Sequence, residues 1–97
     1  MGKYTKDQIT SRLGQIPGWD ITPDSGSIER SLVLKNFVAC VDLINKIKDI
    51  AEKQNHHPDL HLTGYKNLKI VLYTHTAGGV TENDFQLAAK INEICLK

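Results

Sequence analysis

The fold is decided by residues 36–74, which read NFVACVDLINKIKDIAEKQNHHPDLHLTGYKNLKIVLYT. In the first half of this stretch, apolar side chains recur at the i, i+3, i+4, i+7 spacing of one helix face, at Phe37, Cys40, Val41, Ile44, Ile47 and Ala51. Asn36 can cap the start of this helix, and Pro58 stops it because the residue before a proline avoids the α region. We therefore predict a long helix that begins after Asn36 and ends at about Gln54.

The second half of the stretch shows the period of two that is typical of half-buried antiparallel strands. Leu60 and Leu62 alternate with polar neighbours, and apolar side chains alternate again after Asn67. We predict two antiparallel strands, Asp59–Thr63 and Leu68–Thr74, joined by the loop of residues 64–67.

Upstream of this stretch the pattern predicts one helix and two strands. Thr5 can cap a helix that runs to about Gln15, and Gln8 can complete a capping box with it. Residues 19–22 form a short extended piece, and a turn at residues 23–26 leads into a strand over Ser27–Leu34.

Downstream, a turn at residues 77–79 precedes a last helix that Thr81 caps and that runs to about Leu96. The element order is therefore α-β-β-α-β-β-α. This order favours an α+β fold, in which three helices pack on one face of a four-stranded antiparallel sheet.

The composition excludes several classes of protein. The chain has 97 residues, enough for one domain with a modest core, and a small core makes oligomers a common remedy. Its 12 Lys+Arg against 11 Asp+Glu lack the excess of cations that direct binding to nucleic acid needs. No apolar run approaches the roughly 18 residues of a membrane span, and residues 1–10 contain no hydrophobic signal region. We expect a soluble, cytoplasmic protein.

The two cysteines, Cys40 and Cys95, are too few and too far apart for a disulfide framework or a CxxC metal site. Both fall at or near the apolar faces of their predicted helices. We therefore interpret them as buried free thiols that fill core volume.

All four histidines fall between His56 and His75. They could be polar residues without a specific role, ligands of a metal, or unmetallated acid–base groups. The metal interpretation is weakened because His57 and His61 are separated by Pro58 and cannot share a helical turn. The acid–base interpretation is favoured by the adjacent pair at the helix end, since imidazole exchanges protons readily near neutral pH.

The chain resembles the pterin-4a-carbinolamine dehydratases (4a-hydroxytetrahydrobiopterin dehydratases) at a set of positions with matching spacings: Glu52, His56, His57, Pro58, Tyr65, His75 and Asp84. The resemblance also covers residues 17–19 and the order of all seven elements. It therefore implies a single dehydratase-like domain over residues 1–97.

The resemblance implies the loss of water from a 4a-hydroxytetrahydropterin to give a quinonoid dihydropterin, in the recycling of tetrahydrobiopterin. His56 and His75 would act as acid and base, and His57 would orient the pterin and assist proton transfer. No metal and no cofactor would be required.

The resemblance also implies a set of pterin-binding residues: Glu52, His57, Pro58, Thr74, Thr76, Ala77, Trp19 and Asp84. Glu52 would orient His56 or bind the amino edge of the pterin, but it could also be a solvated helix carboxylate. Asp84 could equally serve only to stabilise the start of its helix, at the capping-box position. Trp19 could wall the pocket or fill the core, and Tyr65 could pack the turn.

The implied partners are the pterin substrate and further copies of the chain, in a homodimer or homotetramer. A functional link to an aromatic amino acid hydroxylase follows from the same resemblance. The alternative function is a non-enzymatic dimerisation or coactivator module that binds a transcription factor through the helix of residues 37–51, which would add the nucleus to the expected locations.

Overall fold

The computed structural model describes residues 2–95. Its elements are α1 (Lys6–Arg12), the 3₁₀ turn η1 (Leu13–Gln15), β1 (Asp20–Ile21), β2 (Ile28–Val33), α2 (Phe37–Gln54), β3 (Asp59–Thr63), β4 (Asn67–Leu72), the 3₁₀ turn η2 (His75–Ala77) and α3 (Glu82–Cys95). The predicted element order and the α+β class are confirmed. None of the helices in this range is long and apolar enough to cross a membrane.

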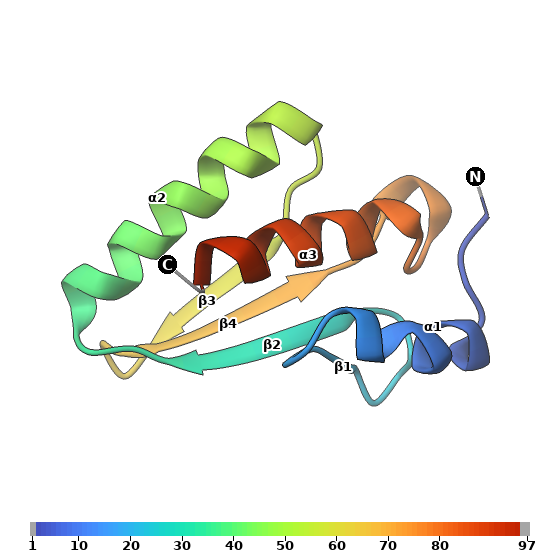
Figure 1. Ribbon diagram of the computed structural model, residues 1–97, viewed down its shortest axis with the longest axis horizontal. Helices are drawn as coiled ribbons and strands as arrows, with labels where there is room; N and C mark the ends of the chain where they lie inside the picture. The colour runs from blue at the N-terminus through green and yellow to red at the C-terminus, as the bar shows by residue number, and fades with distance from the viewer. Residues whose placement is uncertain (1, 96–97) are drawn as a thin grey trace.

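The four strands form one antiparallel sheet in the order β1-β2-β4-β3. Helices α2 and α3 lie over one face of this sheet, and α1 lies near β1 and the start of α3 (Figure 1). Turn η2 connects the end of β4, an inner strand of the sheet, to the start of α3, so it brings these two ends together. The end of α2 returns to the sheet through residues 55–58.

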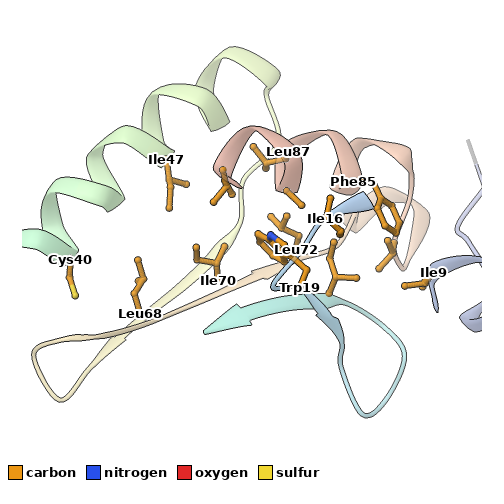
Figure 2. Packing of buried hydrophobic residues seen from close by; sticks show 14 residues of the cluster. Ile9, Ile16, Trp19, Cys40, Ile47, Leu68, Ile70, Leu72, Phe85 and Leu87 are labelled. Carbon is orange, nitrogen blue, oxygen red and sulfur yellow. The ribbon is translucent and has the colours of Figure 1, made fainter. Parts of the chain in front are cut away.

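The buried side chains form one cluster between the sheet and the helices (Figure 2). Ile28, Leu68, Ile70 and Leu72 supply the sheet side, and residues of all three helices supply the other side: Ile9, Cys40, Ile47, Phe85, Leu87, Ala88 and Ile91. Cys40 is buried and Cys95 is half-buried, and both are free thiols. Burial raises the pKa of the Cys95 thiol, which keeps it in its unreactive protonated form.

The first two α-helices, α1 and α2, start where the sequence predicts. Thr5 and Gln8 form the predicted capping box, and the Asn36 side chain accepts from the N–H of Ala39 at 2.8 Å. The helix predicted to run to Gln15 changes to 3₁₀ geometry after Arg12. The predicted end of the last helix at Leu96 lies outside the described residues.

Two further expectations differ from the structure. Phe37 is 55% exposed although it belongs to the predicted apolar stripe, whereas Cys40 in the same first turn of α2 is buried. Strand β4 ends at Leu72 and not at Thr74, because Thr74 leaves the ladder and pairs with Gly79 in an isolated bridge. The chain then turns at once into η2.

Candidate active site at the histidine cluster

The two adjacent histidines that follow α2, His56 and His57, point in different directions. Asn55 adopts the left-handed conformation (φ 51°), which asparagine tolerates better than most residues, and its N–H donates to the carbonyl groups of Ala51 and Glu52. Pro58 then fixes the chain in an extended course. As a result the side chain of His56 points toward α3, whereas the side chain of His57 points back toward α2.

His56 contacts a buried carboxylate on α3. Its Nε2 lies 2.5 Å from Oδ1 of Asp84, and the two side chains are 12% and 0% exposed. The second carboxylate oxygen of Asp84 accepts from the N–H of Thr81 at 2.8 Å and from the hydroxyl of Thr74 at 2.9 Å. Asp84 therefore caps α3, a role that the sequence allows for it, and it also holds His56, a contact that the sequence does not predict. A buried carboxylate is tolerated here because both oxygens are hydrogen-bonded.

His57 contacts Glu52. Its Nε2 lies 2.5 Å from Oε2 of Glu52, and both side chains are mostly exposed. The expectation that Glu52 orients His56 is not what the structure shows. That expectation requires the helix to continue through His56. The left-handed Asn55 instead ends the helix and places His57, not His56, next to Glu52.

His75 begins η2 and is exposed. Its Nε2 lies 2.9 Å from the hydroxyl of Tyr73. The intervening Thr74 directs its side chain to Asp84 and, at 2.8 Å, to the hydroxyl of Thr81. His56 and the segment that carries His75 are thus joined through Asp84 and Thr74.

The three histidines share one feature of hydrogen bonding. In each ring Nε2 makes the contact, to Asp84, Glu52 or Tyr73. Within residues 2–95, the hydrogen bonds of these rings involve no Nδ1 atom. Nδ1 is therefore the nitrogen that each ring has free to exchange a proton with a bound molecule.

Other predicted site residues are placed as follows. Thr76 is exposed and Ala77 is half-buried in η2, beside His75. Pro58 is half-buried and, with His57 and Glu52, borders a cavity of about 260 Å³ between α2 and β3. His61 is exposed on β3.

Trp19 belongs to the core and does not wall the histidine site. Its side chain is 3% exposed, and its indole N–H donates to Asn92 at 2.8 Å. Asn92 lies eight residues beyond Asp84 on α3, which at 1.5 Å per residue is about 12 Å along the helix. Burial therefore supports the core interpretation of Trp19.

Sequence reasoning misses Tyr73, and it names Thr74 only as a pterin-binding residue, without the role of its side chain. The hydroxyl of Thr74 and the phenol of Tyr73 contact Asp84 and His75 directly. The alternation of side chains along an extended segment could have paired Tyr73 with His75. The contact of Thr74 depends on the position of α3, which spacing along the chain does not report.

The histidines are not arranged as a metal centre. In the part of the chain that the structure describes, no group of three or more His, Cys, Asp or Glu side chains could hold a metal ion. Each site histidine instead has a single oxygen partner. Such pairs are suited to proton transfer, in which the partner fixes the ring and its tautomer.

Comparisons with known proteins agree on one family. The family model described as pterin 4 alpha carbinolamine dehydratase matches residues 2–94. The mitochondrial pterin-4-alpha-carbinolamine dehydratase 2 of Arabidopsis thaliana is 46% identical over 92 residues, which are 93% of this chain and 49% of that protein. This chain thus spans about half the length of the plant relative. A Sulfolobus acidocaldarius protein that bears the same dehydratase name provisionally is 41% identical, over 95% of this chain and 98% of its own length.

A solved structure shows the same fold over nearly the whole chain. The crystal structure of a transcriptional coactivator/pterin dehydratase from Brucella melitensis matches with a TM-score of 0.88 and 30% identity, and the match covers 96% of this chain and 98% of that one. The histidine geometry, the family match and the fold agree, and the chain belongs to the pterin 4 alpha carbinolamine dehydratase family.

Proposed function

We propose that this protein removes water from a 4a-hydroxytetrahydropterin to give a quinonoid dihydropterin. The observation that carries the proposal is the bond between His56 and the buried Asp84, with the His75 segment joined to the same carboxylate through Thr74. Membership of the dehydratase family supports the reaction class.

The reaction needs two proton transfers. One group protonates the 4a-hydroxyl so that the carbon–oxygen bond breaks and water leaves, and another accepts the proton that a ring nitrogen loses. Proton and electron pairs balance without a redox step. General acid–base catalysis contributes about 10²–10⁴-fold for such a transfer.

We assign these transfers to His56 and His75, with His57 as the ring that orients the pterin and assists. Nδ1 is the exchanging nitrogen in each case, because Nε2 is occupied. Glu52 and Pro58 lie beside His57, Thr76 and Ala77 lie beside His75, and these four residues would bind the pterin. The physiological setting that we propose is tetrahydrobiopterin recycling in the cytoplasm, in support of an aromatic amino acid hydroxylase.

The second candidate is a module that binds a transcription factor. It is favoured by the coactivator name of the Brucella melitensis relative and by Phe37 and Val38, which are 55% and 64% exposed at the start of α2. This function would use the helix surface, so it would survive replacement of His56, His57 and His75 by alanine. Dehydratase activity would be lost in the same variant.

The test is the formation of quinonoid dihydropterin from a 4a-hydroxytetrahydropterin by His56→Ala and His75→Ala proteins. We expect each variant to lose about 10²-fold or more in kcat. The matched control is His61→Ala, which replaces an exposed histidine on β3 outside the site. Folded His56→Ala and His75→Ala proteins that turn over as fast as His61→Ala would refute the proposal.

A further inference from the structure

Tyr73 and His75 lie on the same side of the extended segment that follows β4. The backbone of Thr74 is extended, and side chains two residues apart on such a backbone leave on the same side. The Tyr73 hydroxyl is 2.9 Å from Nε2 of His75, and the two ring centroids are 5.0 Å apart with an interplanar angle of 45°. Thr74 leaves on the other side, toward Asp84. The alternation thus gives His75 a partner outside the catalytic set assigned above.

The partner of His75 differs in kind from those of the other two histidines. An ionised carboxylate only accepts hydrogen bonds, so Nε2 of His56 and of His57 must be the donor to Asp84 and Glu52. A phenol both donates and accepts. If Tyr73 accepts from the Nε2–H of His75, the bond persists when Nδ1 gains or loses a proton. If Tyr73 donates to Nε2, its hydroxyl must rotate and become the acceptor whenever the ring becomes an imidazolium.

His75 needs a partner because little else restrains its side chain. It is exposed at the first position of a three-residue 3₁₀ turn. An exposed side chain samples several rotamers, and each orientation presents a different ring atom to the substrate. One well-placed hydrogen bond is enough to favour a single orientation.

We propose that Tyr73 is a positioning residue for His75, a role that rests on the proposed dehydratase function. Its hydroxyl accepts the Nε2–H bond and holds the ring so that Nδ1 exchanges the proton with the pterin. The hydroxyl carries this effect, and the aromatic ring contributes packing that a phenylalanine would keep.

The kinetic test compares Tyr73→Phe with Tyr65→Phe. Tyr65 is a matched control because it is 60% exposed in the turn before β4, and the six residues of that strand place it about 20 Å from the site. We expect Tyr73→Phe to lower kcat by about three- to tenfold, the worth of one hydrogen bond, and to leave KM within about twofold. Tyr65→Phe should match the wild type.

A double-mutant cycle separates positioning from general support of the fold. In a His75→Ala background, Tyr73→Phe should cause no further loss, because the group that it positions is gone. The proposal is overturned if Tyr73→Phe has the wild-type kcat. It is also overturned if the loss is the same with and without His75.

A second measurement needs no turnover. Nitrogen-15 NMR of the imidazole rings reports which nitrogen carries the proton of a neutral histidine. In the wild type we expect His75 to carry it on Nε2, and in Tyr73→Phe we expect its tautomer populations to move toward those of the exposed His61. Identical His75 populations in the two proteins, or a wild-type proton on Nδ1, would overturn the proposal. An inactive wild-type protein would refute the dehydratase function. The NMR measurement would still test whether Tyr73 fixes the tautomer of His75.

Discussion

At the scale of single residues, the site histidines are distinguished by the oxygen that each one contacts. Asp84 is fully buried and satisfies three donors at once, from His56, Thr74 and Thr81. Glu52 makes one such contact and is largely exposed. Because a buried, fully satisfied carboxylate can adopt few alternative arrangements, the position of His56 is fixed more firmly than that of His57.

Replacement of Asp84 by asparagine should damage stability and activity together. The amide retains one acceptor oxygen and gains an N–H₂ group, so it cannot accept from His56, Thr74 and Thr81 simultaneously. We expect the free energy of unfolding to fall by about 1–3 kcal/mol, since a buried donor is left without a partner. The dehydratase rate should fall by about tenfold or more, as expected when a proton-transfer group loses its orientation.

Urea unfolding and steady-state kinetics check both effects of Asp84→Asn. The matched control is Asp49→Asn, because Asp49 is 77% exposed on α2 and makes only a long contact of 3.8 Å to Lys48. This control should resemble the wild type. If the two variants are equally stable and equally active, Asp84 has neither role.

At the scale of elements, a polar cluster ties the N-terminal segment and α1 to the start of α3. The Arg12 guanidinium contacts both carboxylate oxygens of Glu82, at 2.5 and 3.2 Å, and the Tyr4 hydroxyl donates to the same carboxylate at 2.8 Å. Arg12 also lies over the ring of Phe85, with the guanidinium carbon 4.5 Å from the ring centroid. The N–H of Tyr4 donates to the carbonyl of Val80 at 2.7 Å. The helix that carries Asp84 is therefore anchored from outside the site.

This cluster predicts a pH-dependent contribution to stability. The hydrogen bonds from Arg12 and Tyr4 hold the pKa of Glu82 below its ordinary value of 4.5. A carboxyl group whose pKa is lower in the folded state stabilises the fold above its unfolded pKa, and this contribution is lost as the pH falls through the folded pKa. Since Arg12 and Glu82 are 27% and 38% exposed, solvent screening limits the effect to about 0.5–1 kcal/mol.

Thermal or urea unfolding of the wild type and of Glu82→Gln between pH 7 and pH 3 checks this contribution. The wild type should be the more stable protein at pH 7, and the difference should shrink below about pH 4.5. Glu93→Gln, on the exposed part of the same helix, serves as the control and should show no such trend. A difference that stays constant down to pH 3 would contradict the role of the Glu82 charge.

Most elements could be predicted from the sequence because their signals are local. The caps at Thr5 and Asn36 and the apolar spacing of α2 determine helix starts from a few neighbouring residues. The ends of α2 and β4 are harder to predict from the sequence. They are set by the left-handed Asn55 and by the bridge of Thr74 with Gly79, and both depend on how the chain packs against the sheet. For the same reason spacing pointed to Glu52 as the partner of His56, whereas Asp84 is brought there by the packing of α3.

At the scale of the whole molecule, the exposed apolar side chains gather away from the site. Among residues 2–95, the large ones are Val33, Phe37, Val38 and Tyr65. Val33 ends β2, pairs with Asn67 beside the turn that carries Tyr65, and is followed after three residues by the start of α2. This end of the sheet lies opposite the end at which β4 leads into η2 (Figure 1). A self-association surface here would leave the histidines accessible.

A small domain that exposes such side chains is expected to associate, because a chain of 97 residues buries a limited fraction of its surface on folding. We predict a homodimer or homotetramer. The double variant Phe37→Ser with Val38→Ser should shift the association equilibrium toward smaller species, since each replacement removes apolar area from the contact. Multi-angle light scattering at micromolar concentration measures the mass of both proteins. The control is Lys46→Ser with Lys53→Ser, which changes exposed polar positions of the same helix and should keep the wild-type mass. A monomeric wild type would contradict association, and a double serine variant of unchanged mass would place the contact elsewhere on the molecule.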